Sequence, residues 1–122
     1  MHNSTKTKNF GSTKTGMHHW LMQRVTAAIL VLSSGWVFYL GSELKGHSMG
    51  QIVTILQSPV NIVPLIIFTI IGFYHAALGM QVVIEDYIPN LCIRYSMILL
   101  VKIFAFITVI SSIAALIYLM VL

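Results

Sequence analysis

Charged residues are scarce in this sequence. Only 8% of its 122 residues are charged, whereas 57% are hydrophobic. An ordinary soluble domain carries roughly 25% charged residues, and so few charges cannot cover the surface of a water-soluble fold. The composition therefore excludes a soluble enzyme or soluble binding module and predicts a single integral membrane domain.

Clustered basic residues and cysteines are also lacking. The seven Lys and Arg residues are scattered along the chain, which excludes a surface that follows a nucleic-acid backbone. The single cysteine, Cys92, has no partner for an internal disulfide and no metal-ligand spacing, so we interpret it as apolar filling. The N-terminus lacks the charged, apolar and small-residue order of a secretory signal, and we expect no cleavable signal.

Three long apolar segments dominate what is present. They cover about residues 20–42, 62–86 and 95–120 and follow a polar N-terminal tail, residues 1–17. Each segment reaches the ~20 residues that a helix needs to cross a ~30 Å hydrocarbon core. Inside lipid each backbone polar group must be satisfied within the segment, and helices do this. The predicted fold is therefore all-α, with three transmembrane helices.

The connections between the spans contain turn formers and an uneven distribution of charge. We expect a short surface helix at Met49–Leu56, place Pro64 in the first turn of the second span, and predict a tight turn at Pro89. Basic residues gather around the start of the first span and around the second connection: Lys6, Lys8, Lys14, Arg24, Arg94 and Lys102. The positive-inside rule therefore places the N-terminus on the cytoplasmic or matrix side and the C-terminus on the opposite side.

The second span carries a histidine, His75, in a stretch from about Ile62 to Ile84 that has no charged residue. Burying a polar group in hydrocarbon is costly unless the group has a partner. On an ideal helix Gly72 and Gly79 share the face of His75, one turn to either side. Two interpretations stay open. Either the glycines leave room for a flat macrocycle with His75 as its axial nitrogen, or they permit close helix packing with His75 hydrogen-bonded to a neighbour.

The depth of His75 in the membrane favours a ligand role. It lies eleven residues before Asp86, which marks the predicted cytoplasmic boundary. At about 1.5 Å per residue this is ~16 Å, near the bilayer midplane. No second histidine reaches that depth, because His18 and His19 lie at the entrance of the first span and His47 lies on the opposite side. If His75 binds haem iron with two histidine ligands, the other ligand must come from another chain.

The cytoplasmic end of the second span gathers polar side chains. Asp86 falls within about 20° of the His75 face, and Tyr87 falls about 120° from it. Tyr87 is either an interfacial anchor or a phenol, placed by Glu85 and Asp86, that donates to the carbonyl of a lipid-soluble quinone while the carboxylates relay protons. Arg24, a turn inside the boundary, either snorkels to the headgroups or pairs with haem propionates.

Two stretches together carry a resemblance to a known family. HHWLMQRVTA opens the first span and HAALGMQVVIEDYI closes the second. They resemble the small hydrophobic membrane-anchor (D) subunits of succinate:quinone oxidoreductase, respiratory complex II, of the alphaproteobacterial and mitochondrially encoded type. The likeness covers almost the whole chain. It implies a subunit that does no chemistry alone, in a bacterial or mitochondrial inner membrane, with a large cytochrome b anchor subunit, an iron–sulfur subunit and a flavoprotein subunit.

The resemblance also implies roles for five residues. His75 matches an axial ligand of haem b, whose other axial histidine comes from the cytochrome b subunit. Tyr87 matches the tyrosine that hydrogen-bonds ubiquinone, and Asp86 matches an acidic residue linked to quinone protonation. Arg24 matches an arginine near the haem propionates, and His18 matches a histidine at the same entrance. Electrons would then pass from the iron–sulfur subunit to ubiquinone.

Other functions stay open from the residues alone. The first alternative is a haem-free anchor that only docks quinone, which a visible spectrum without a haem signal would identify. A homo-oligomeric transporter or channel would use His75 and Asp86 on a proton path and would work without other subunits. A homodimeric cytochrome b would need two histidines per chain at membrane depth, and this chain has one.

Overall fold

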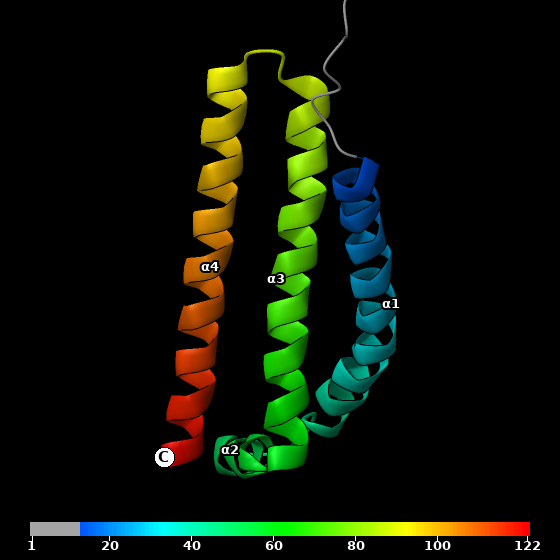
Figure 1. Ribbon diagram of the computed structural model, residues 1–122. Coiled ribbons are helices and arrows are strands. Elements are labelled where there is room, and N and C mark those ends of the chain that lie inside the picture. Colours follow the sequence, from blue (N-terminus) through cyan, green and yellow to red (C-terminus); the bar gives the residue numbers. More distant parts are fainter. Residues whose placement is uncertain (1–12) are drawn as a thin grey trace, which may run out of the picture.

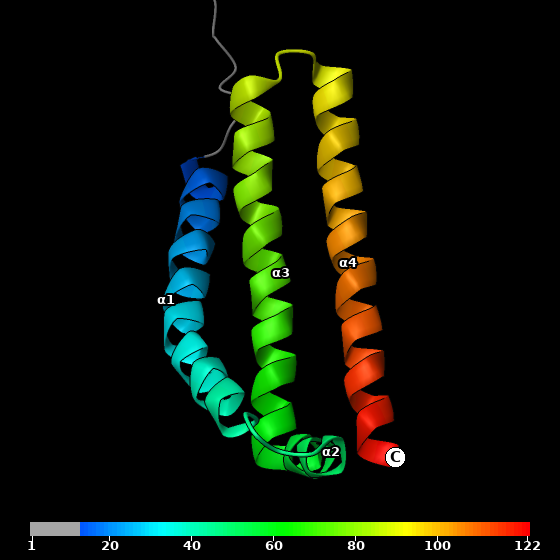
Figure 2. The ribbon, with the colours of Figure 1, turned by 180° about the vertical axis from the view of Figure 1, so that it is seen from behind.

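The computed structural model describes residues 13–122, and this part of the chain is helical throughout apart from its connections. The elements are α1 (Thr13–Glu43), α2 (Met49–Gln57), α3 (Pro59–Tyr87) and α4 (Leu91–Val121). The three long helices lie side by side with α3 in the middle, and α2 lies across the end near the C-terminus (Figures 1 and 2). Each long helix is long and apolar enough to cross a membrane. The predicted all-α fold with three transmembrane helices is confirmed.

The helices begin before the apolar segments do. Helix α1 starts at Thr13, so the end of the predicted polar tail is helical, and the rest of that tail lies outside the described residues. Helix α3 starts at Pro59, whose fixed φ and missing N–H suit the first helical position. Pro64 therefore lies inside α3 rather than in its first turn, and that prediction is wrong. In this first turn Asn61 Nδ2 donates to the Ile55 carbonyl at 2.8 Å, which joins the start of α3 to α2.

The first connection contains the short surface helix that the sequence predicts, here α2. At its start the side-chain oxygen of Gln51 accepts a hydrogen bond from the backbone N–H of Ser48 at 2.9 Å, which satisfies a donor at the helix end. At its other end Gln57 Nε2 donates to the Leu119 carbonyl at 3.0 Å. Helix α2 is thereby tied to the end of α4.

The second connection is a tight turn between α3 and α4. The side-chain oxygen of Asn90 accepts from the backbone N–H groups of Cys92 at 3.0 Å and Ile93 at 3.2 Å, which caps the start of α4. Arg94 Nε donates to the Ile88 carbonyl at 2.8 Å and holds the turn from the other side. Cys92, in the first turn of α4, is exposed and therefore fills no gap within this chain.

Helix α3 is the hub of the molecule. It contacts both α1 and α4, whereas α1 and α4 make no close contact in the described part of the chain. Few apolar side chains are buried by these contacts, namely Leu40, Ile62, Ile84 and Ile98 among the described residues. The outward-facing apolar side chains suit lipid or another membrane subunit, because lipid tails are as apolar as they are. The residues that bear on function are therefore sought along α3.

Candidate functional site

His75 lies in the middle of α3 and is hydrogen-bonded to α1. Its Nδ1 atom is 2.8 Å from Oγ1 of Thr26. The same Oγ1 lies 2.7 Å from the carbonyl oxygen of Met22, one turn earlier in α1. Thr26 is buried, with 7% of its surface exposed. The polar side chain of His75 thus has the partner that its place in an apolar span requires.

The glycines beside His75 lie against α1. A Cβ atom on Gly79 would stand 3.4 Å from Nε2 of Gln23, and one on Gly72 would stand 3.8 Å from Cδ2 of Leu30. Both distances are ordinary van der Waals contacts, so a side chain of α1 lies beside each glycine and leaves room for one methyl group. The hydrogen-bonded neighbour of the second interpretation is present in Thr26, whereas the glycines permit the contact with α1 without being required for it.

A cavity of about 370 Å³ lies between α1 and α3 and has both His75 and Arg24 in its wall. Val82 and Ala27 supply apolar wall, and Trp20 adds a ring whose centroid is 5.6 Å from Cζ of Arg24. A guanidinium at this distance from an indole makes a cation–π contact, which holds Arg24 at the cavity. One cavity thus combines an imidazole, a guanidinium and apolar wall.

Uncommitted polar atoms surround this cavity. No described residue forms a hydrogen bond with Nε2 of His75, whose other nitrogen is the one bound to Thr26. His19 and Gln23 also line the cavity, and His19 Nε2 and Gln23 Oε1 are buried without a hydrogen-bond partner in the described part of the chain. Buried polar atoms without partners are uncommon and call for a ligand or a partner chain. The arrangement suits a flat apolar group that carries a metal and anionic substituents.

The chain offers such a metal one ligand rather than a set of ligands. Among the described residues, no three His, Cys, Asp or Glu side chains gather closely enough to hold a metal ion. A metal at His75 would therefore need ligands from its own macrocycle and from another chain.

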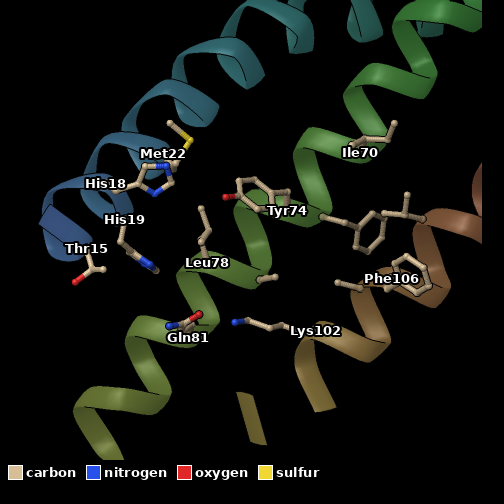
Figure 3. A pocket seen from close by; sticks show the side chains of 14 residues that line it. Thr15, His18, His19, Met22, Ile70, Tyr74, Leu78, Gln81, Lys102 and Phe106 are labelled. Carbon is tan, nitrogen blue, oxygen red and sulfur yellow. The ribbon is translucent and has the colours of Figure 1, made fainter. Parts of the chain in front are cut away.

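His18 faces a different cavity from His75. This second cavity, of about 620 Å³, lies among α1, α3 and α4, with His18, Tyr74 and Lys102 in its wall and the Lys102 amine pointing toward Gln81 (Figure 3). The structure therefore brings Arg24, but not His18, to the cavity of His75. The reason is helical geometry, because His18 lies about 80° around α1 from the Thr26 direction.

Sequence reasoning gave no part in the His75 site to three residues: His19 and Gln23, which line its cavity, and Thr26, which is hydrogen-bonded to its ring. His19, Gln23 and Thr26 follow a spacing of four and then three residues, which places them on one face of α1. That periodicity was available in the sequence. The direction of this face toward His75 was not, because helical periodicity says nothing of how a helix is rotated against its neighbour.

The two carboxylates and the tyrosine at the end of α3 are exposed, and Tyr87 has 81% of its surface accessible. Glu85 accepts a hydrogen bond from Gln81 Nε2 at 2.8 Å, one turn earlier on the same helix. Within the described residues no hydrogen bond joins Glu85 to Tyr87, and neither Tyr87 nor Asp86 lines either cavity. The network in which Glu85 and Asp86 place the Tyr87 hydroxyl therefore stays a prediction, with no hydrogen bond for it among the described residues.

Comparison with known proteins gives a consistent family. The family described as succinate dehydrogenase/fumarate reductase transmembrane subunit matches residues 3–109. The succinate dehydrogenase hydrophobic membrane anchor subunit of Rickettsia bellii is 48% identical over 113 residues, which is 93% of this chain and 90% of that protein. Its counterpart in Rickettsia conorii is 45% identical over 114 residues, with the same coverage.

A more distant relative extends the comparison to another group of organisms. The succinate dehydrogenase membrane anchor subunit of Reclinomonas americana is 30% identical over 105 residues, which is 82% of this chain and 86% of that protein. No solved structure gives a significant match. With three candidate membrane-spanning helices and these relatives, the chain is a multi-pass membrane protein and belongs to the succinate dehydrogenase/fumarate reductase transmembrane subunit family, as a membrane-anchor subunit of succinate dehydrogenase.

Proposed function

We propose that this anchor subunit helps to hold haem b through His75 and forms part of the site at which ubiquinone is reduced. In this proposal it pairs with a large cytochrome b anchor subunit. It receives electrons from an iron–sulfur subunit, which a flavoprotein subunit supplies by oxidising succinate. The N-terminus and the turn between α3 and α4 face the cytoplasm or matrix, where these peripheral subunits dock.

The observation that carries the haem proposal is the direction of the His75 ring. Its Nδ1 is engaged by Thr26, its Nε2 has no partner among the described residues, and Arg24 lines the same cavity. His75 would supply one axial nitrogen, the cytochrome b subunit would supply the other, and Arg24 would pair with propionates through its forked donors. When bound, haem b supplies one-electron redox chemistry between the anchor chains. Because His18 lines the second cavity, its propionate contact stays a prediction.

The quinone proposal rests on the exposed end of α3. The Tyr87 hydroxyl would donate a hydrogen bond to a quinone carbonyl and stabilise the charge that develops on its oxygen during reduction. Asp86 and ordered water would deliver protons from the cytoplasmic or matrix side. Neither side chain is committed to another described residue, so both are available to quinone and to the iron–sulfur subunit.

A reduced-minus-oxidised visible spectrum of the purified complex tests the haem proposal. We expect a low-spin b-type signal in the wild type that is lost or strongly shifted in His75→Ala. The matched control is His47→Ala, because His47 is exposed in the first connection, far from the cavity, and its replacement is expected to leave the signal unchanged. An identical signal in His75→Ala and wild type would refute ligation by His75.

A haem-free anchor that docks quinone is the second candidate. The hydrogen bond between His75 and Thr26 favours it, since this bond gives the histidine a partner within the chain without a macrocycle. It predicts an intact wild-type complex that reduces quinone yet shows no b-type signal. The same spectrum therefore decides between the two candidates.

A further inference from the structure

We infer that Thr26 is the positioning residue of His75: its hydroxyl accepts the Nδ1 proton of His75 and so presents the lone pair of Nε2 to the haem iron. This inference rests on the proposed haem ligation and extends it to a residue of another helix. Thr26 and His75 are 49 positions apart in the chain, and their side chains meet across the α1–α3 contact at 2.8 Å.

The count of protons at Thr26 decides the direction of this hydrogen bond. A threonine hydroxyl has one proton to donate and lone pairs to accept with. The Met22 carbonyl, at 2.7 Å, is an acceptor only, and a helical threonine commonly donates to the carbonyl four residues earlier. If the proton of Thr26 goes to Met22, then Nδ1 of His75 must carry a proton and donate it to Oγ1.

The tautomer that follows is the one that a metal ligand needs. A neutral imidazole with its proton on Nδ1 has its lone pair on Nε2. The opposite arrangement, in which Thr26 donates to Nδ1, would place the proton on Nε2 and block ligation there. Metal-bound histidines almost always donate their other N–H group to an acceptor that fixes tautomer and ring orientation, and Thr26 supplies that acceptor here.

The packing of the two helices holds Thr26 in register with His75. Gln23, Thr26 and Leu30 lie on one face of α1 and meet Gly79, His75 and Gly72 in reverse order along α3. Contacts of Gln23 with Gly79 and of Leu30 with Gly72 flank the pair on both sides and keep Thr26 opposite the ring. The burial of Thr26 keeps water from competing for the Nδ1 proton.

Replacing Thr26 should change how haem is held and its potential, rather than the assembly of the helices. Thr26→Val keeps the β-branched shape and removes the acceptor, which leaves the Nδ1 proton without a partner. Outer-shell partners of this kind typically contribute about 10–100-fold to metal affinity. An imidazole that donates a hydrogen bond is also a stronger electron donor to iron, so removal of the acceptor should raise the haem midpoint potential.

The experiment measures haem content and haem midpoint potential in purified complexes of wild type, Thr26→Val and Thr26→Ser, normalised to assembled complex. We expect at least a tenfold loss of haem affinity and an upward shift of potential in Thr26→Val, with both returning toward wild type in Thr26→Ser. The matched control is Thr69→Val in α3. Thr69 makes the same kind of bond, to the Leu65 carbonyl at 2.8 Å, but its side chain bonds no other helix in the described part of the chain.

The outcomes separate this inference from the proposed function. A wild-type complex without haem refutes both. If the haem of the wild type is lost in His75→Ala, but Thr26→Val has the haem content and midpoint potential of the wild type, only the role of Thr26 is refuted. Equal shifts in Thr26→Val and Thr69→Val would also refute it. If Thr26→Val does not assemble, Thr26→Ala gives the same readout without the branched side chain, and wild-type values there would refute the inference.

Discussion

The middle of α3 and its end at Tyr87 differ in how their polar groups are satisfied. In the middle, His75 is bonded to Thr26, and Thr26 in turn lies within hydrogen-bond distance of a helix carbonyl. At the end of the helix, Tyr87 is largely exposed. The side chains of Tyr87 and Asp86 form no hydrogen bond with any described residue. Both regions belong to one continuous helix.

The difference indicates where the chain completes a site and where it supplies only part of one. A polar group at membrane depth has no water to bind, so the chain itself must supply a partner. A polar group at the rim can bind water until another subunit covers it. We therefore expect substitutions in the middle to alter haem properties and substitutions at the end to alter quinone reduction, each leaving the other property intact.

The largest effect is expected at Tyr87. Tyr87→Phe removes the hydroxyl that would polarise the quinone carbonyl, so quinone reductase activity of the complex should fall by about 100-fold. Succinate oxidation by artificial dyes and the haem spectrum should not change. The control is Tyr95→Phe, an exposed tyrosine near the start of α4. Unchanged quinone reduction in Tyr87→Phe would refute a role of the Tyr87 end of α3 in the quinone site.

A smaller effect is expected at the two adjacent carboxylates, and it should be unequal. Asp86→Asn removes a free carboxylate and should lower quinone reduction by about tenfold, since proton delivery slows. Glu85→Gln should stay within about twofold, because Glu85 already accepts a hydrogen bond from Gln81 on its own helix. Steady-state kinetics of the two variants with the same quinone provide the measurement. Equal losses would show that the intrahelical bond does not set Glu85 apart.

A modest effect is expected at Arg24, which lines the cavity of His75. Arg24→Gln removes the guanidinium that would pair with propionates, and exposed ion pairs of this kind contribute about 0.2–1 kcal/mol, or up to about fivefold in affinity. Haem retention during dilution or washing of the purified complex measures the change. Lys45→Gln, in the first connection, controls for the loss of one positive charge. Equal haem retention in both variants would remove Arg24 from the haem site.

Most of the fold could be predicted from the sequence, because each spanning helix satisfies its own backbone within one continuous apolar segment. The three spans and the short helix at α2 follow from local composition. The start of α3 could not be predicted in this way, because the helix begins at Pro59, in residues that hydropathy assigns to the connection.

The candidate site was predictable only in part. His75 was visible as a histidine without a charged neighbour in an apolar span, and its need for a partner followed from its depth. The identity of that partner, Thr26, was not visible, since a helical threonine that bonds its own backbone leaves no pattern in the sequence. The sequence also did not show that His18 and Arg24 line two different cavities.

By itself the sequence determined that this protein crosses a membrane three times, that one histidine lies at the middle of the second span, and that a tyrosine and two carboxylates close that span. These properties depend on the number and period of residues along single helices. Only the tertiary structure decided that α1 turns Thr26 toward His75, that the two glycines lie against α1, and that Glu85 is committed while Asp86 and Tyr87 are free of described partners. The physical reason is that periodicity defines the faces of each helix, whereas packing between helices decides which faces meet.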